Sequence, residues 1–373
     1  MTRAEATPTR VVPTPTSIPE PALVFLEATV WTSQPRVPVL VYHRFLPDHY
    51  PYSTKVKMRL GDFRDQLERL YRSGYTLIAL DRWLSGEILV PEGRRPLILT
   101  IDDLFFADQV ALTEDGVHSI ETGLGVLWQF AQEFPEFGNA VALFPNLGNK
   151  LYPGGEEVLA QVIAYSIEHG AIPYNHFYMH PMLELTNPRG IHLEAERNDR
   201  YLRELLRLIE REDLIAQLGN IIALTYGVWP DQKAGRDAIL AYVTPEGMAL
   251  QAILEVDFAV RAKFLAPPYA ESFDRLHVPR IVATEDAIKL LTETSESFPA
   301  AHVCSIGPLD PAREADVSYL QLQILKSRRE NGCPDGVYVI GHNAFQVNFY
   351  RVDRIFPASP SDYPSDGHGE KGP

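Results

Sequence analysis

Short apolar runs alternate with amphipathic segments along most of the chain. The run "VPVLVYHRF" at 37–45 is rich in valine and has no helical period, so it predicts a buried strand. The segment "DFRDQLERLYRSGY" at 62–75 then places Phe63, Leu67 and Leu70 on one face of a helix. A buried strand followed by a helix that covers it is the repeating unit of a parallel sheet.

The same alternation continues towards the C-terminus. Further strands are expected at 76–80, 96–103, 140–145, 220–227, 280–283 and 336–342, and further helices at 155–170 and 194–211. Strands separated by helices in this way predict an α/β fold, with a (β/α) barrel over residues 31–300. In such barrels the catalytic groups lie at the C-terminal ends of the strands, so polar residues directly after each strand are the first candidates for chemistry.

The two ends of the chain differ from the rest in composition. Residues 1–30 begin "MTRAEATPTRVVPTPTSIPEPA", and this Thr/Pro-rich stretch predicts a disordered tether. Residues 301–355 are expected to be an extension that could complete the barrel, and 356–373 a disordered tail. A tether favours an extracellular or cell-surface protein whose export signal or anchor is absent from this sequence. A disordered tail on a cytosolic protein is the alternative that the composition also allows.

Charge and composition exclude several classes of partner. The 49 acidic residues outnumber the 34 basic residues and give a net charge of −15, so nucleic acid and anionic membranes are poor partners. No apolar run approaches the roughly 18 residues needed to span a bilayer. We expect a monomer with one large core. Cys304 and Cys333 could pair in an oxidising compartment, but they form no metal-binding CxxC motif.

Two carboxylates and two histidines come directly after expected strands. Asp102 and Asp103 end the apolar run 97–101, and His176 and His180 stand four residues apart in "NHFYMHP". One carboxylate and two imidazoles with an open position are the pattern of a catalytic Zn²⁺ or a similar divalent ion. Two alternatives remain at this point. One of the acids could cap a following helix, and the histidines could form a hydrogen-bonded polar pair.

The order of these motifs resembles the polysaccharide deacetylases of carbohydrate esterase family four, which share the NodB-homology domain. The resemblance spans about residues 37–283. It rests on "VPVLVYHRF" as the opening strand, "DFRDQLERLYRSGYTLIALDRWL" as the next helix and strand, "LTIDD" as the TFDD motif, "HGAIPYNHFYMHP" as the H-[ST]-x-x-H-P motif, "IALTYG" as the R-x-P-Y or YPYG segment, and "ESFDRLHVPRI" as a late segment.

This resemblance implies a deformed (β/α) barrel and a metal-dependent hydrolase. Its reaction would remove N-acetyl, or O-acetyl, groups from a carbohydrate polymer or oligomer, so the implied partner is an acetylated glycan. The implied cofactor is a divalent metal, with Zn²⁺ the first choice. Asp103, His176 and His180 would bind the metal, while Asp102 would be the general base.

Two further roles and two departures come with the resemblance. The backbone amide of Tyr226 would stabilise the oxyanion, and His342, at the end of the last expected strand, would be the general acid. Phe177 stands where the family has a Ser or Thr that steadies the metal-site loop. Leu224 or Thr225 stands near the usual arginine, so we expect the general base to lack an arginine partner.

Two other functions remain open from the sequence. The departures would suit a carbohydrate-binding relic that keeps the fold and has lost catalysis, and a metal-dependent hydrolase with another substrate would use the same site. His43 ends the first strand and would face the same end of the barrel. Because the three-ligand set closes without it, we expect a structural hydrogen-bonding role for His43.

Overall fold

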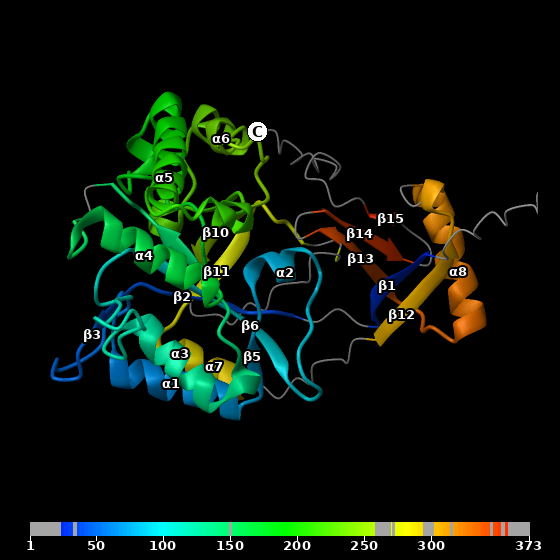
Figure 1. Cartoon of the computed structure of the whole chain (residues 1–373), viewed down its shortest axis with the longest axis horizontal. Coiled ribbons are helices and arrows are strands. Elements are labelled where there is room, and N and C mark those ends of the chain that lie inside the picture. Colours follow the sequence, from blue (N-terminus) through cyan, green and yellow to red (C-terminus); the bar gives the residue numbers. More distant parts are fainter. Residues whose placement is uncertain are drawn as a thin grey trace, which may run out of the picture.

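A computed structural model of the chain is shown in Figure 1. It describes residues 24–32, 36–148, 151–257, 270, 273–293, 302–313, 316–343, 346–351 and 355–356. The described residues form two parts: a large helix-covered barrel and a smaller antiparallel sheet beside it.

In the described part of the chain, seven parallel strands form the barrel. Their order around the ring is β8-β7-β6-β2-β11-β10-β9. The ring closes between its two end strands, because Asn175, just beyond β8, bridges Ile222 of β9. The strands are β2 (Val39–Tyr42), β6 (Arg95–Leu104), β7 (Val141–Pro145), β8 (Ala171–Pro173), β9 (Ile221–Ala223), β10 (Ala252–Asp257) and β11 (Val278–Val282). The predicted (β/α) barrel is therefore confirmed, and its short β8 and β9 account for its deformed shape.

Smaller elements extend the strands of the ring. The strand β5 (Tyr75–Leu77) pairs with the start of β6, and β3 (Arg44–Leu46) pairs with β4 (Lys57–Arg59). Short 3-10 helices occupy Pro135–Phe137, Leu183–Leu185, Glu212–Gln217, Thr225–Gly227 and Pro311–Arg313.

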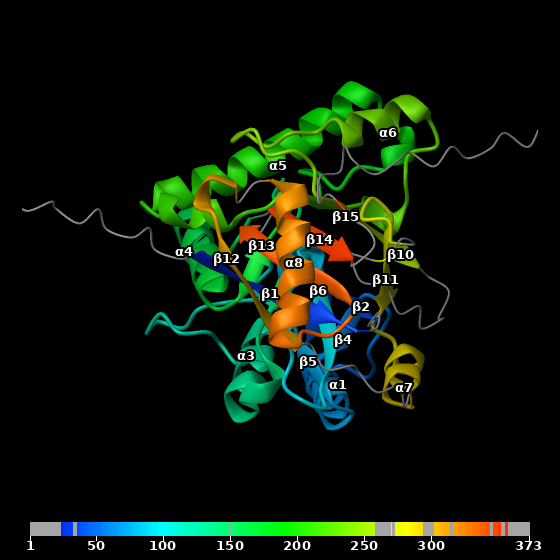
Figure 2. The ribbon, with the colours of Figure 1, turned by 90° about the vertical axis from the view of Figure 1, so that its right-hand side faces the viewer.

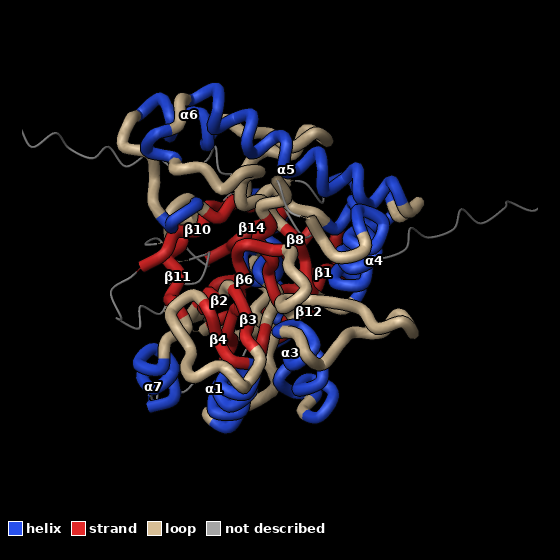
Figure 3. The backbone as a smooth tube through the Cα atoms, turned by 90° about the vertical axis from the view of Figure 1, so that its left-hand side faces the viewer, coloured by secondary structure: helices blue, strands red, loops and turns tan. Residues whose placement is uncertain are grey.

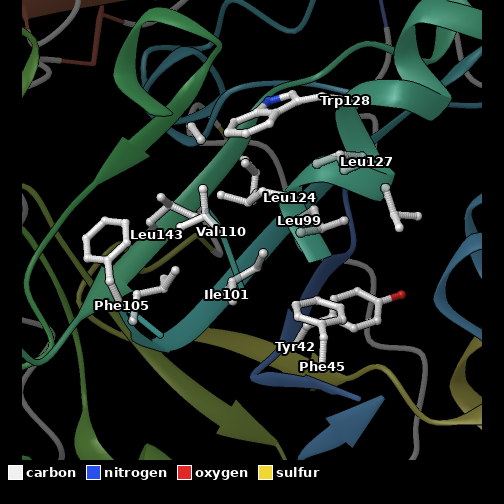
Figure 4. Packing of buried hydrophobic residues seen from close by; sticks show 14 of the residues in the cluster. Tyr42, Phe45, Leu99, Ile101, Phe105, Val110, Leu124, Leu127, Trp128 and Leu143 are labelled. Carbon is white, nitrogen blue, oxygen red and sulfur yellow. The ribbon is translucent and has the colours of Figure 1, made fainter. Parts of the chain in front are cut away.

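Helices surround the outside of the ring, as Figure 3 shows. They are α1 (Leu60–Arg72), α3 (Gly123–Glu133), α4 (Gly155–Glu168), α5 (Pro188–Leu208), α6 (Lys233–Leu240) and α7 (Glu285–Glu293). Outward-facing strand residues such as Leu99, Ile101 and Leu143 pack against Leu124 and Leu127 of α3 (Figure 4). None of the helices among the described residues is long and apolar enough to cross a membrane.

The inward-facing side chains fill the barrel. Because successive strand residues point to opposite faces, Ile98 and Ala142 point inward while their neighbours face the helices. They belong to one apolar cluster with Trp83 of α2 (Leu80–Leu84) and with Trp31. This cluster also includes residues at the starts of strands, such as Val278, so it closes the N-terminal end of the barrel and leaves the C-terminal end for chemistry.

The antiparallel sheet is built from both ends of the described chain. Its order is β12-β1-β13-β14-β15, with β1 (Val24–Trp31), β12 (His302–Leu309), β13 (Val337–Asn343), β14 (Gln346–Arg351) and β15 (Ile355–Phe356). Helix α8 (Val317–Asn331) covers one face of the sheet (Figure 2), where it packs on Ala28 and Val30. The disulfide between Cys304 and Cys333 joins β12 to the segment after α8.

Two of the expected boundaries need correction. Residues 24–30, which we expected in the tether, form most of β1, because alternate residues of this stretch are buried under α8. The strands between 302 and 356 form a sheet of their own and do not complete the barrel ring. The rest of the expected tether, 1–23, and 357–373 of the expected tail lie outside the described residues.

Deletion of residues 1–31 is expected to lower the thermal midpoint by at least about 10 °C. The deletion removes a strand that pairs on both sides and takes away Trp31, which is only 2% exposed. Circular dichroism melting measures the shift, and a deletion of 1–22, which removes no described strand, is the control. A 1–31 deletion that melts with the control would contradict the central place of β1.

Candidate metal centre

Asp103, His176 and His180 converge at the C-terminal end of the barrel. Oδ1 of Asp103 lies 3.4 Å from Nε2 of His180 and 3.8 Å from Nε2 of His176. One ligand atom from each of the three residues lies within 4.8 Å of the others. Asp103 comes from the end of β6, and the two histidines come from the loop after β8. The structure therefore brings together the three residues that the sequence motif selected.

His176 is held in the form that binds metals. Its ring is buried, and Nδ1–H donates a hydrogen bond of 2.8 Å to the carbonyl oxygen of Ala223. This bond leaves the lone pair of Nε2 directed towards Asp103 and His180. Burial lowers the pKa of His176 to about 4, although Asp102 and Asp103 oppose this shift. The imidazole is therefore neutral at physiological pH, as metal coordination requires.

The donor set fits a divalent cation with an open coordination position. It offers two imidazole nitrogens and one carboxylate oxygen, which is a set typical of zinc and related ions. The side chains of Asp103 and His180 are 30% and 22% exposed, so the site opens to solvent on one side. Asn146 adds a weak outer contact, because its amide lies 3.5 Å from Oδ1 of Asp103.

Four of the site residues have a strained backbone. Asp103, Phe177, His180 and Tyr226 have φ between 53° and 61°, and the fifth non-glycine residue with positive φ among those described is Glu210. Each such conformation costs on the order of 1 kcal/mol or more and persists where its surroundings impose it. No pattern in the sequence indicated this strain. These strained residues are concentrated around the candidate metal centre.

Asp102 forms a buried ion pair with Arg280, which corrects our expectation that it lacks an arginine partner. Nη1 and Nη2 of Arg280 donate hydrogen bonds of 2.5 and 2.8 Å to the two carboxylate oxygens. Both side chains point into the barrel and are almost fully buried. The arginine comes from β11 and not from the turn after β9, where the motif had suggested it. An arginine in the otherwise apolar run "VPRIVA" was the signal for it.

The environment of Asp102 keeps its carboxylate ionised. Burial acts to raise the Asp102 pKa, but the charge of Arg280 lowers it, with help from His176, the Arg280 hydrogen bonds and His43. The net result is a pKa below the ordinary value of an aspartate. The missing arginine was one reason to consider a catalytically inactive relic, and that reason no longer holds.

His43 lies beside Asp102. The register of β2 on β6 pairs Tyr42 with Ile101, so the next residues along the two strands, His43 and Asp102, are neighbours. The Gln109 amide donates hydrogen bonds to the carbonyl oxygens of both, at 2.9 and 3.0 Å. Nδ1 of His43 is buried and has no hydrogen-bond partner within the described structure. The structural hydrogen bond that we expected from this ring is therefore not found at Nδ1.

The turn after β9 carries Tyr226 to the same site. The Tyr226 ring packs edge-on against His180, with 4.7 Å between the ring centroids. The Thr225 hydroxyl donates a 2.6 Å hydrogen bond to the carbonyl oxygen of Pro181, which ties the turn to the histidine loop. Among the described residues, no backbone carbonyl accepts a hydrogen bond from the Tyr226 amide.

The structure does not bring His342 into this group. His342 belongs to β13 of the antiparallel sheet, which is outside the barrel ring. Its side chain lies outside the described part of the chain. The role of general acid that the resemblance gave to His342 stays a prediction.

Comparison with known proteins gives structural neighbours only. No family model matches the chain, and no curated protein matches it. Among solved structures, IcaB from Ammonifex degensii is 18% identical, with a TM-score of 0.46, over 69% of this chain and 96% of that one. The deacetylase PplD from Streptococcus pyogenes is 15% identical, with a TM-score of 0.46, over 70% of this chain and 100% of that one. A polysaccharide deacetylase from Bacillus cereus is 16% identical, with a TM-score of 0.44, over 70% of both chains. The barrel fold of this chain rests on its own strand order.

Proposed function

We propose that the chain is a metal-dependent hydrolase that removes N-acetyl, or O-acetyl, groups from a carbohydrate polymer or oligomer. The observation that carries this proposal is the cluster of Asp103, His176 and His180 at the open end of the barrel, next to the ionised Asp102. The three residues would hold the ion, and Zn²⁺ suits the two imidazoles best. When bound, such an ion supplies Lewis-acid activation of water and of a carbonyl group.

Asp102 is the general base in this proposal. Its Oδ2 lies 3.8 Å from Nε2 of His176, so the carboxylate borders the space between the ligands. Arg280 holds both carboxylate oxygens, which fixes their direction and keeps the group ionised. An ionised carboxylate in this place can take the proton of a water that attacks the acetyl carbonyl carbon.

Two other groups complete the chemistry. The Tyr226 amide, which has no backbone acceptor among the described residues, would donate a hydrogen bond to the developing oxyanion. His342 stays the general acid that the resemblance implies, and His43 is a second candidate for donating the proton to the departing amine. Strand register makes His43 the neighbour of Asp102 at the same end of the barrel, while His342 lies on a strand of the other sheet.

The location and the substrate class rest on other observations. The disulfide between Cys304 and Cys333 favours an oxidising compartment and so an extracellular or cell-surface protein. The sugar itself is chosen by loops around the barrel end, and an acetylated glycan is the class that the ordered sequence motifs support. We propose that the protein acts as a monomer.

Asp102→Asn is expected to lower turnover by roughly 10²-fold or more while metal content stays near the wild-type value. The amide keeps the size of the carboxylate but cannot accept the proton, and Asp102 is not among the three ligands. Acetate release from a panel of acetylated glycans and elemental analysis measure the two quantities. Asp103→Asn is the matched control, because it should weaken metal binding first.

Three results would count against this assignment. If Asp102→Asn loses the metal while Asp103→Asn keeps both metal and activity, the two roles are reversed. If the wild-type protein binds metal and releases no acetate from any glycan, the carbohydrate-binding relic is the better function. If it hydrolyses only other amides or esters, the substrate class is wrong.

A further inference from the structure

Asn198 is a fully buried polar residue on α5 whose side-chain hydrogen bonds all leave the helix. Its Oδ1 accepts a 2.9 Å hydrogen bond from the backbone amide of Leu147. Its Nδ2 donates to the carbonyl oxygen of Pro145 at 2.8 Å and lies 3.4 Å from Oδ1 of Asn175. One side chain thus joins the loop after β7 to the loop after β8.

Two of these contacts lead to the backbone of His176 and of the residue after it. The carbonyl oxygen of Pro145 that accepts from Asn198 also accepts from the backbone amide of His176, at 3.2 Å. Oδ1 of Asn175, the other contact of Asn198, accepts from the backbone amide of Phe177 at 2.8 Å. The buried ligand and the residue after it are therefore fixed to acceptors that Asn198 orients.

The same side chain is also linked indirectly to the carboxylate ligand Asp103. Asn146 lies between Pro145 and Leu147, the two residues that Asn198 binds in the β7 loop, and its amide faces Asp103 at 3.5 Å. By holding this loop, Asn198 positions Asn146, which contacts Asp103. It also positions the carbonyl oxygen of Pro145, which accepts a hydrogen bond from the amide of His176.

The local sequence explains why the loop requires such support. Phe177 and His180 have positive φ, so this loop does not adopt its shape without outside contacts. The Phe177 side chain is buried in an apolar cluster against α5 and α6 and carries no hydroxyl group to steady the loop. Asn198 supplies polar contacts from the helix side instead, and Asn175 supplies one from within the loop.

We infer that Asn198 is a positioning residue for the candidate metal centre and sets the affinity of Asp103, His176 and His180 for a divalent ion. This inference rests on the proposed function, because it assumes that the three residues bind an ion. Loss of a partner that orients a metal ligand typically weakens metal binding by about 10- to 100-fold. The buried Asn198 amide is such a partner, because its contacts hold the backbone at His176 and, through Asn146, bear on Asp103.

The test measures Co²⁺ affinity by competition with a chelating dye and records the absorption spectrum of the bound Co²⁺. Asn198→Leu, which keeps the size of the side chain and removes all three polar contacts, should weaken Co²⁺ binding by about 10- to 100-fold and change the spectrum. The control is Ser166→Ala, which removes a buried 2.7 Å hydrogen bond to the carbonyl oxygen of Val162 within α4 and none of the contacts of Asn198. Its Co²⁺ affinity should stay within about twofold of wild type.

The outcomes separate the two proposals. If the wild-type protein binds no Co²⁺ at this site, the proposed function fails and the inference fails with it. If the wild type binds Co²⁺ and folded Asn198→Leu binds it equally well, only the inference is overturned. Equal losses of Co²⁺ affinity in Asn198→Leu and Ser166→Ala would show general destabilisation of the protein and would also overturn the inference. If Asn198→Leu does not fold, Asn198→Ala at low temperature takes its place under the same criteria.

Discussion

His176→Ala and His180→Ala are each expected to abolish stoichiometric metal binding and, with it, acetate release. The centre offers three protein ligands among the described residues, so the loss of one leaves two donors, fewer than catalytic zinc sites retain. Without the ion the pKa of an attacking water is no longer lowered towards neutrality, so turnover should fall to background. Elemental analysis after dialysis and acetate release measure the two effects.

The matched control for these variants is His302→Ala. His302 is exposed on β12 in the antiparallel sheet, outside the barrel, so its loss should leave metal content and activity unchanged. Retention of one ion per chain in the double variant His176→Ala/His180→Ala would rule out the site as described.

Arg280→Met is expected to lower the free energy of unfolding by about 3–5 kcal/mol. Arg280 is completely buried, and its removal leaves the Asp102 carboxylate inside the barrel without its countercharge. Methionine fills similar space, so the cost comes mainly from the unpaired charge and less from a cavity. Urea unfolding followed by circular dichroism measures the difference.

Two further variants isolate the charge effect. The double variant Arg280→Met/Asp102→Asn should recover most of the lost stability, because no charge then remains unpaired. Arg72→Met removes an exposed arginine paired with Glu68 and should change stability little. If Arg280→Met were as stable as Arg72→Met, the ion pair would not be a principal support of the barrel interior.

The barrel and the three candidate ligands could be predicted because their signals are local. Each buried strand is an apolar run of a few residues, and each covering helix has one apolar face, so a short window of sequence suffices. His176 and His180 are four residues apart, and Asp103 comes at the end of an apolar run. The rule that active groups lie just beyond strands then joins one of the two acids and the two histidines into one site, and the resemblance to the polysaccharide deacetylases chose Asp103 as the acid.

The parts that sequence reasoning missed depend on contacts between distant segments. Arg280 and Asp102 are 178 residues apart, and no local pattern states that their side chains both face the same interior. Asn198 stands in a strongly charged segment, where the sequence gives no sign that this polar residue is buried. In the folded chain Asn198 lies on the buried face of α5, and only there does its side-chain amide contact the two loops.

The tether boundary was wrong for a related reason. The run Val24–Trp31 is rich in β-branched and aromatic residues that favour a strand, but the strands that pair with it lie near the other end of the chain. Without knowledge of those neighbours, a short stretch after a Thr/Pro-rich segment looks like its continuation.

The position of β1 also determines the order in which the chain can assemble during synthesis. β1 leaves the ribosome before any barrel strand, whereas its partners β12 and β13 leave after all of them. The barrel can therefore close while β1 still has two unpaired edges and an exposed apolar face. Pairings between such distant segments form slowly, and waiting strands are prone to join other chains. Nascent chains of this protein should thus depend on chaperones that shield the first strand until translation ends.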